Sequence, residues 1–383
     1  MNSGLLDQLR SAQDLVMSLA KQLDEDDFRT QFHPELSPLG WHLGHCIYTE
    51  CYWLQEVVQQ DSRFTAPLRE LYTPPLTPKP ERGKKIPGPQ AMQQWAQDMQ
   101  SMNYTTLAAN DTGIGEHPLM QDDYLVYFII QHYSQHYENM TMVLTQRALG
   151  ARMPAYRVEN PLLAKQPEAI TCNIEPGHYR VGGKAPLAYD NELPEQQATL
   201  GPFRIARKPV ANAEFLAFIE AGGYNRQDLW DDAGWQWLQQ EKVTAPQNWR
   251  RDVAGNWYGI GVRGGYDLHG DDVVHGISLH EAQAYAVWAG GQLPHEHQWE
   301  VACRLQQLED SGRAWEWCGN RFYPYEAFTP FPYREYSQAW FDGRHYTLRG
   351  GSLHTRPAIK RASFRNFYQA DKRHIFSGLR LVY

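Results

Sequence analysis

The stretch LVYFIIQHYSQHYENMTMVL, residues 125–144, predicts one long and largely buried helix, because apolar runs enter and leave its polar centre. His132 and His136 are four residues apart, so both project from one face of a helix and can reach one metal ion. Among 15 histidines, such a pair can also arise by chance. Buried imidazoles need partners, however, and His45 far upstream can supply a third nitrogen. The pattern favours a facial three-histidine metal site.

The segment SPLGWHLGH, residues 37–45, predicts the start of a second buried helix. Ser37 is the expected N-cap and Pro38 the expected first helical residue. His42 and His45 are three residues apart, so both can face inward from this helix.

Composition sets the frame for these two segments. The chain has 383 residues, 42% of them hydrophobic, which is enough for two cores. A net charge of -8 argues against a nucleic-acid or acidic-membrane surface. Without an apolar run of membrane-spanning length or a secretory signal, we expect a cytoplasmic protein. The odd number of scattered cysteines, five, fits a reducing compartment.

The chain changes character near residue 150. Residues 1–150 are predicted to form a metal-binding, up-and-down bundle with helices at about 4–24, 38–60, 88–109 and 121–149, separated by a Pro-rich loop at 72–89 and a loop at 110–118. Residues 151–175 form a connector without clear periodicity. Residues 176–383 predict an irregular mixed domain held by aromatic packing, with helices at 212–220 and 278–289. Ser278 and Glu281 form a capping box at the second of these helices.

The second half carries a set of short signatures in a characteristic order. They are YDNE (189–192), PVANAEF (209–215), GGY (222–224), LPHEHQWE (293–300), WEW (315–317), RGGS (349–352) and GLR (378–380). Through them this half resembles the formylglycine-generating-enzyme/sulfatase-modifying-factor fold, which is C-type-lectin-like. A fold alone does not give a function.

The first half resembles the DinB-like four-helix bundle. Its fusion to a sulfatase-modifying-factor domain, an α+β chain, is similar to the ergothioneine sulfoxide synthases (EgtB-like), ovothiol synthases and selenoneine synthases (SenA-like). The resemblance implies that His45, His132 and His136 bind iron(II) and that dioxygen is a co-substrate. On ligand chemistry alone zinc would fit equally well. His42 is expected to be structural or to lie behind the ligands.

The resemblance also implies the residues around the substrate, hercynine, which is N-trimethylated histidine. Gln135 and Asn366 match the positions that contact its carboxylate, and Phe367 matches an aromatic that packs against the quaternary ammonium. Tyr333 is the expected proton donor, and Tyr336 is expected to support the pocket. The chain is therefore expected to be a nonheme iron(II) oxidoreductase that acts on small molecules.

The second substrate is expected to be a thiol or selenium donor. Family members that use γ-glutamylcysteine have an acidic residue where this chain has Tyr368, so an α-ammonium group would lose its ion-pair partner here. The Pro-rich loop still offers Arg82 for a donor carboxylate or phosphate, beside Lys79, Lys84 and Lys85. The overall pattern leans toward the selenoneine branch and a selenosugar donor.

The same residues bear on other possible functions. A formylglycine-generating enzyme needs a cysteine pair shortly after the RGGS signature, and residues 353–360 contain no cysteine. A non-catalytic carbohydrate-binding or protein-binding module would leave the three histidines without a purpose. An ovothiol-type synthase acting on histidine and a DinB-type metal-dependent thiol transferase both remain open.

Overall fold

The computed structural model describes residues 3–109, 114–151 and 156–383. The contacts between residues divide the chain into two compact units. The first, the helical unit, contains the described residues up to 151 together with 185–187 and 354–359. The second, the mixed unit, contains the described residues from 156 to 184, 188–353 and 360–383. No helix within the described ranges is both long enough and apolar enough to cross a membrane.

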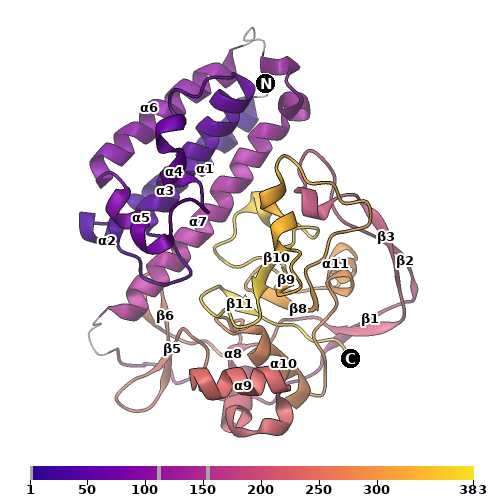
Figure 1. Cartoon of the computed structure of the whole chain (residues 1–383). Helices are drawn as coiled ribbons and strands as arrows, with labels where there is room; N and C mark the ends of the chain where they lie inside the picture. The colour runs from indigo at the N-terminus through magenta and orange to yellow at the C-terminus, as the bar shows by residue number, and fades with distance from the viewer. Residues whose placement is uncertain (1–2, 110–113, 152–155) are drawn as a thin grey trace. The chain divides into compact units, whose positions relative to one another are not determined.

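Four long helices build the helical unit (Figure 1): α1 (Ser3–Ala20), α3 (Leu39–Cys51), α6 (Pro89–Ala108) and α7 (Tyr124–Gly150). The chain continues from α3 into a π-helical segment, η1 (Tyr52–Val58). Helix α7 packs against both α1 and α3, and α3 also packs against α6. The apolar side chains of α7 that were expected to be buried are buried, including Leu125, Phe128, Met140 and Val143.

Two predicted boundaries of these helices were wrong. Helix α3 begins at Leu39 with Pro38 as its N-cap, and Ser37 does not cap it because the Ser37 hydroxyl accepts a hydrogen bond from Arg82 instead. The first helix ends at Ala20, short of residue 24. Asp24 starts the next helix, α2 (Glu25–Arg29), by accepting the backbone N–H of Asp27.

The Pro-rich segment at 72–89 was predicted to be a loop, and this prediction was wrong. It contains α5 (Lys79–Lys85), which follows η2 (Ala66–Leu68) and α4 (Arg69–Tyr72). Pro80 lies in the first turn of α5, where a missing N–H does no harm, so this proline favours a helix start. Of the predicted loop at 110–118, residues 110–113 lie outside the described residues, as do 152–155 of the connector. The remainder of that loop forms η3 (Ile114–Glu116) and enters η4 (Pro118–Asp123).

The mixed unit contains short strands in small sheets, which fits the irregular mixed domain that the sequence predicted. Its largest sheet within the described residues has the order β10-β9-β8-β11 (Figure 1), antiparallel except for the β8–β11 pair. The other sheets have the orders β5-β6-β7, β1-β4 and β2-β3. The strands are β1 (Thr171–Ile174), β2 (Gly177–Val181), β3 (Gln196–Leu200), β4 (Phe203–Ala206), β5 (Trp249–Arg251), β6 (Trp257–Gly261), β7 (Gly264–Asp267), β8 (Trp315–Arg321), β9 (His345–Arg349), β10 (Asn366–Gln369) and β11 (Ser377–Gly378).

Both helices predicted for the mixed unit are present, as α8 (Asn212–Glu220) and α10 (Leu279–Trp288). The capping box of α10 is confirmed: Ser278 N–H donates to Glu281 at 2.8 Å, and Glu281 N–H donates to the Ser278 hydroxyl at 3.1 Å. The prediction missed α9 (Asp232–Glu241) and α11 (Glu296–Arg304). Short 3-10 turns add η5 (Asp190–Glu192), η6 (Gly223–Asn225), η7 (Gln227–Leu229), η8 (Arg334–Tyr336), η9 (Gln338–Trp340) and η10 (Pro357–Ile359), of which η10 belongs to the helical unit.

Buried ion pairs explain several signatures of the mixed unit. Glu296 at the start of α11 accepts from Arg349 at 2.7 Å and from Arg365 at 2.8 Å. Glu316 on β8 likewise pairs with Arg380 at 2.7 Å. The LPHEHQWE, WEW, RGGS and GLR signatures therefore supply the charged core of this unit. Because Arg365 immediately precedes β10, the pair with Glu296 also fixes the strand that begins at Asn366.

Candidate metal centre

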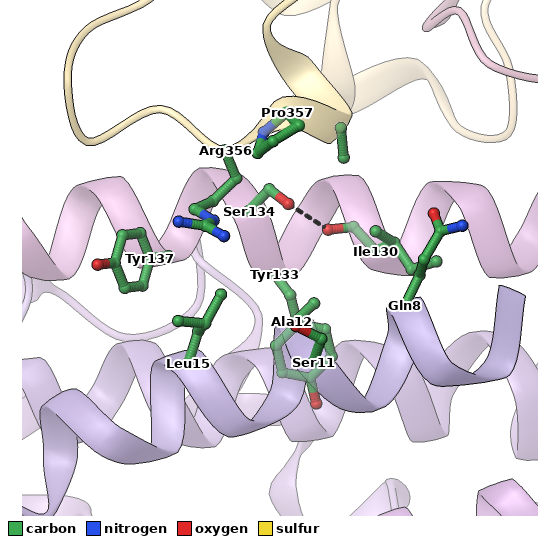
Figure 2. A pocket seen from close by; sticks show the side chains of 11 residues that line it. Gln8, Ser11, Ala12, Leu15, Ile130, Tyr133, Ser134, Tyr137, Arg356 and Pro357 are labelled. Carbon is green, nitrogen blue, oxygen red and sulfur yellow. Dashed lines mark hydrogen bonds between the residues drawn. The ribbon is translucent and has the colours of Figure 1, made fainter. Parts of the chain in front are cut away.

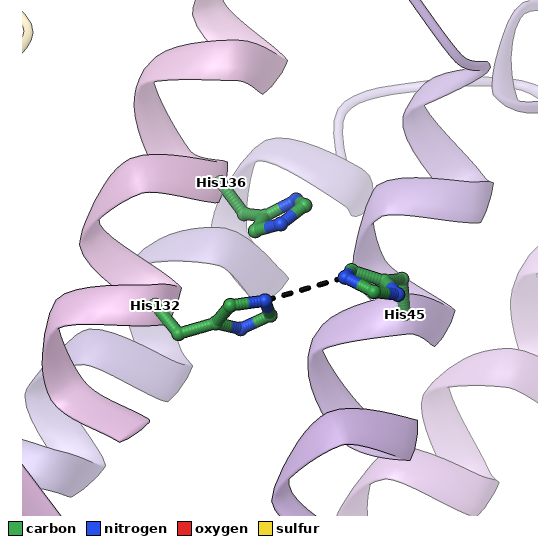
Figure 3. A group of neighbouring side chains, drawn as sticks. All are labelled: His45, His132 and His136. Carbon is green, nitrogen blue, oxygen red and sulfur yellow. Dashed lines mark hydrogen bonds between the residues drawn. The ribbon is translucent and has the colours of Figure 1, made fainter. Parts of the chain in front are cut away.

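Three histidine rings converge between α3 and α7. His45 on α3 faces His132 and His136, which lie one turn apart on α7 (Figure 3). Each ring offers a nitrogen, and these three nitrogens all lie within 4.8 Å of one another. His45 and His132 are buried, and His136 is half-buried. The structure thus brings together the three residues that the spacing and the resemblance singled out.

A hydrogen bond to the backbone carbonyl of Tyr72 fixes the orientation of the His45 ring. Its Nδ1 lies 2.7 Å from the carbonyl oxygen of Tyr72, and since a carbonyl can only accept, Nδ1 carries the proton. The lone pair is therefore on Nε2, the atom that faces His132. Gly44 permits this close approach, because a Cβ there would lie 2.4 Å from Cε1 of Tyr72. Trp41 stacks on the face of the His45 ring at a centroid distance of 4.7 Å.

For His45 and His132, the spacing of the nitrogens fits a shared metal ion. The Nε2 atoms of His45 and His132 are 3.2 Å apart. Two nitrogens that bind one ion at ~2.1 Å with an angle near a right angle lie ~3 Å apart. Three neutral imidazole nitrogens suit iron, zinc and other borderline divalent metals alike. The donor set therefore fits a divalent metal and does not by itself select one.

Burial keeps the three rings ready to bind a cation. It lowers the pKa of His45 to about 4, although the bond to the Tyr72 carbonyl opposes this shift. Burial also holds the pKa values of His132 and His136 well below the usual value, and the neighbouring histidines lower them further. At neutral pH the rings are therefore uncharged, and no proton has to leave before a metal binds.

A fourth histidine, His42, lies against His136. Nδ1 of His42 on α3 lies 3.0 Å from Nδ1 of His136. Burial lowers the pKa of His42 to about 3, and His45, Arg82 and Lys79 add to that shift. Nε2 of His42 is buried and has no hydrogen-bond partner among the described residues. His42 is outside the group of three whose nitrogens converge.

A buried polar network that the sequence did not reveal lies beside the metal centre. Glu50, one and a half turns after His45 on α3, is 1% exposed. Its carboxylate accepts from Gln13 at 2.9 Å, from Asn103 at 2.9 Å and from Tyr133 at 2.7 Å. These donors come from α1, α6 and α7, so the network ties all four long helices together at the level of the histidines.

The other candidates of the helical unit have different surroundings. Gln135 is half-buried on α7 and immediately precedes His136. The Arg82 guanidinium donates to the Thr77 carbonyl at 2.9 Å, the Ser37 hydroxyl at 2.5 Å and the Pro74 carbonyl at 2.5 Å. It also lies 3.9 Å from the centroid of the Trp41 ring that stacks on His45. Its fold contacts are therefore extensive, and its role toward a substrate stays a prediction.

A separate cavity of about 170 Å³ opens on another face of α7 (Figure 2). Ser134 in its wall donates its hydroxyl hydrogen to the Ile130 carbonyl at 2.7 Å. Arg356 reaches its rim, where the guanidinium carbon lies 5.6 Å from the centroid of the Tyr137 ring. None of the three converging histidines lines this cavity, so it is distinct from the candidate metal centre.

In the mixed unit, the predicted proton donor lies on an anchored turn. Tyr333 directly precedes η8, which contains Tyr336, and both tyrosines are half-buried. Ser337 ends this turn and donates its hydroxyl hydrogen to Asp190, which also accepts the backbone N–H of Phe331 at 3.3 Å. Tyr189 stacks on Tyr336 at a centroid distance of 4.3 Å. The YDNE signature thus holds both ends of the tyrosine segment.

The remaining candidates, Asn366, Phe367 and Tyr368, follow one another on β10 and are half-buried. The side-chain oxygen of Asn366 accepts the N–H of Phe367 at 2.9 Å, which leaves its amide hydrogens as the donors for another group. Phe367 stacks on Phe322 at 4.3 Å. Tyr368 packs edge-on against His374 at 5.9 Å.

Comparisons with known proteins agree with this architecture. Residues 8–140 match the DinB superfamily, and residues 159–311 and 307–383 match the sulfatase-modifying factor enzyme 1-like domain. A hercynine oxygenase of Mycolicibacterium thermoresistibile is 30% identical over 98% of this chain and 94% of its own length. The hercynine oxygenase of Mycobacterium tuberculosis is 29% identical over 94% of both chains.

A third relative matches in part. Ergothioneine biosynthesis protein 1 of Schizosaccharomyces pombe is 30% identical over 51% of this chain and 27% of its own length. The two domain matches lie one after the other along the chain, and the first two relatives match nearly its whole length. The chain combines a DinB domain with a sulfatase-modifying factor enzyme 1-like domain. By these matches, it belongs to the hercynine oxygenase family.

Proposed function

We propose that this chain is a nonheme iron(II) enzyme that uses dioxygen to join a sulfur or selenium donor to an imidazole carbon of hercynine. The observation that carries the proposal is the convergence of three neutral imidazole nitrogens in a member of the hercynine oxygenase family. His45, His132 and His136 would hold the iron. When bound, it would supply open coordination positions at which both substrates and dioxygen can meet.

Two amides and one aromatic ring would orient hercynine. Gln135 and Asn366 would donate hydrogen bonds to its carboxylate, and the local bond from Phe367 N–H leaves the Asn366 amide hydrogens available for this. Phe367 would present its ring to the quaternary ammonium, a group that aromatic faces attract. The stacking of Phe367 on Phe322 supports this role, because it fixes the ring plane.

Tyr333 would deliver the proton that the reduction of dioxygen requires. If the product is a sulfoxide, one oxygen atom ends on sulfur and the other leaves as water with the hydrogens displaced from the thiol and the imidazole carbon. A phenol suits this task because it donates a proton without being ionised at rest. Tyr336 would hold the segment in place through its stacking on Tyr189.

The donor would be one without a free α-ammonium group, such as a selenosugar. Tyr368 occupies the strand position at which a carboxylate would be needed to pair with an ammonium, and it packs against His374. The Arg82 guanidinium already donates to the Ser37 hydroxyl and two backbone carbonyls, so any bond to a donor carboxylate would compete with these contacts.

The metal assignment predicts loss of iron in two variants. His132→Ala or His136→Ala removes one nitrogen of the facial set, so we expect neither variant to retain iron after anaerobic loading and desalting, as measured by elemental analysis. His178→Ala is the matched control, because that exposed histidine on β2 pairs with Thr199 and should leave the iron content unchanged. Full iron retention in both α7 variants would overturn the ligand assignment.

The proton-donor assignment predicts a separation of binding from turnover. Tyr333→Phe keeps the ring but removes the hydroxyl, so iron content should stay at the wild-type level while product formation slows or diverts to oxidation of the thiol. Tyr336→Phe is the comparison, because its ring stacking on Tyr189 survives the change. An unchanged product yield in Tyr333→Phe would remove this role from Tyr333.

One assay addresses the substrates. The iron(II)-loaded chain is supplied with hercynine and oxygen, and with cysteine, γ-glutamylcysteine and a selenosugar in competition, and the products are identified by mass spectrometry. We expect the carbon–selenium adduct to dominate. A carbon–sulfur adduct would support the synthase and correct the donor. Absence of any hercynine adduct would contradict the proposal.

A further inference from the structure

His42 stands out because the reaction proposed above gives it no task. It is 5% exposed on α3, one turn before His45, and its Nε2 has no hydrogen-bond partner among the described residues. A buried polar atom without a partner destabilises a fold, so packing alone would favour an apolar side chain here. The hydrogen bond that the ring does make is the one between its Nδ1 and Nδ1 of His136.

The Nδ1 atoms of His42 and His136 cannot both be donors or both be acceptors in their hydrogen bond. Of two neutral rings 3.0 Å apart through their Nδ1 atoms, one must donate and the other accept. If His136 binds a metal through Nε2, the proton of His136 is on Nδ1, and His42 is the acceptor. Histidines that bind metals nearly always donate their second N–H to such a partner, which fixes the tautomer and the ring orientation.

We propose that His42 is a positioning residue of the metal centre, which accepts the Nδ1–H of His136 and thereby presents Nε2 of His136 to the metal. The inference rests on the proposed ligands. It gives His136 a counterpart of the bond that the Tyr72 carbonyl makes to His45. A neutral imidazole as the acceptor adds no negative charge behind the ligand, in contrast to the carboxylates often found there.

The test compares three replacements of His42 in the full chain, with cobalt(II) as the probe metal. His42→Leu removes the acceptor at similar size. In His42→Asn, the side-chain oxygen takes the place of Nδ1, so the acceptor is retained. We expect His42→Leu to bind cobalt about 10- to 100-fold more weakly than the wild type in competition with a chelator, and His42→Asn to recover most of that loss. The visible cobalt spectrum reports the ligand geometry at the same time.

A third variant tests the charge. Asp and Asn have the same shape, so His42→Asp differs from His42→Asn only by a carboxylate in place of an amide. A carboxylate makes His136 a stronger donor to the metal. We therefore expect His42→Asp to bind cobalt more tightly than His42→Asn and to lower the midpoint potential of the iron-loaded chain. Equal affinities and equal potentials in these two variants would overturn the proposal, even if His42→Leu fails to fold.

The controls separate positioning from packing and from ligation. Leu43→Ala opens an apolar gap in α3 beside His42 and should lower the melting temperature of the metal-free chain without weakening cobalt binding. Wild-type cobalt affinity in a folded His42→Leu would show that the bond to His136 has no effect on the centre. Complete loss of cobalt, as expected of His132→Ala, would make His42 a ligand instead. Failure of the wild type to bind cobalt would reject the ligand set itself.

Discussion

The two units bury polar groups in opposite ways. The mixed unit buries charges and pairs them: burial alone would raise the pKa of Glu296, but Arg365 and Arg349 lower it to about 2. The helical unit buries histidines and a glutamate whose pKa values are shifted toward the uncharged form. Burial lowers the pKa of His45 to about 4 and raises that of Glu50, and no arginine or lysine pairs with Glu50 in the part of the chain described.

This difference follows from the different tasks of the buried ion pairs and the buried histidines. A fixed ion pair uses up its lone pairs and its charge within the fold, so it can only hold segments together. A set of neutral imidazoles keeps its lone pairs free for a cation that comes from solution. The mixed unit therefore uses charge to fix β10 and the segments around it, whereas the helical unit uses burial to keep three nitrogens available.

The largest effect is expected from breaking the charged core. Glu296→Ala leaves Arg349 and Arg365 buried with their main partner removed, so the free energy of unfolding should fall by about 3–5 kcal/mol. Denaturant unfolding measures this loss. Glu309→Ala is the control, since its pair with Arg207 is exposed and should contribute less than ~1 kcal/mol. Similar losses in the two variants would contradict the role given to burial.

A smaller loss is expected in the helical unit. In Glu50→Gln the new NH2 group faces one of the donors that now point at the carboxylate, so a buried hydrogen bond is lost. The free energy of unfolding should fall by ~1–3 kcal/mol, and hydrogen exchange should quicken in α3 and α6. The control is Glu70→Gln, an exposed residue in a loose pair with Lys85, for which we expect a change within ~0.5 kcal/mol. A Glu50→Gln chain as stable as the wild type would show that the network is not a structural tie.

The histidine pair of α7 and the network around Glu50 show what the sequence can and cannot reveal. The spacing of His132 and His136 is a local property of a helix, so their shared face was predictable from the chain alone. Glu50 was not predictable, because its donors Gln13, Asn103 and Tyr133 are 37, 53 and 83 residues away along the chain. Only the packing of four helices brings them together.

The errors at the helix boundaries have the same origin. Ser37 has the residue type of an N-cap and stands in the expected place, yet a distant arginine, Arg82, takes its hydroxyl. Helix α5 was missed because prolines suggested a loop, although Pro80 in the first turn was itself a signal for a helix start. The fold class and the helices α8 and α10 were predicted correctly, since they depend on local periodicity and caps. The roles of Tyr333, Asn366 and the other site residues stay predictions.

Asp190 shows whether the pKa shift of a buried carboxyl depends on its ion-pair partner or on the unit in which it lies. It lies in the mixed unit but has no basic partner within the described ranges, and burial raises its pKa from 3.8 to about 6, although bonds from Ser337 and Phe331 oppose this. If pairing decides the sign, Asp190 should respond to pH in the direction opposite to Glu296. The folded chain holds the Asp190 proton more tightly than the unfolded chain does. Its contribution to stability is therefore full below pH 3.8 and is lost as the pH rises through about 6.

Glu296 should behave in the reverse sense, because its contribution is present above its unfolded pKa of 4.5 and is lost only as the pH falls toward about 2. We therefore expect the stability difference between Asp190→Asn and the wild type to change by about 2 kcal/mol between pH 4 and pH 7, in favour of the variant at the higher pH. Thermal unfolding at a series of pH values measures it. A difference that stays constant, or that favours the wild type as the pH rises, would mean that Asp190 is stabilised as an anion and that burial without a cation does not set the sign.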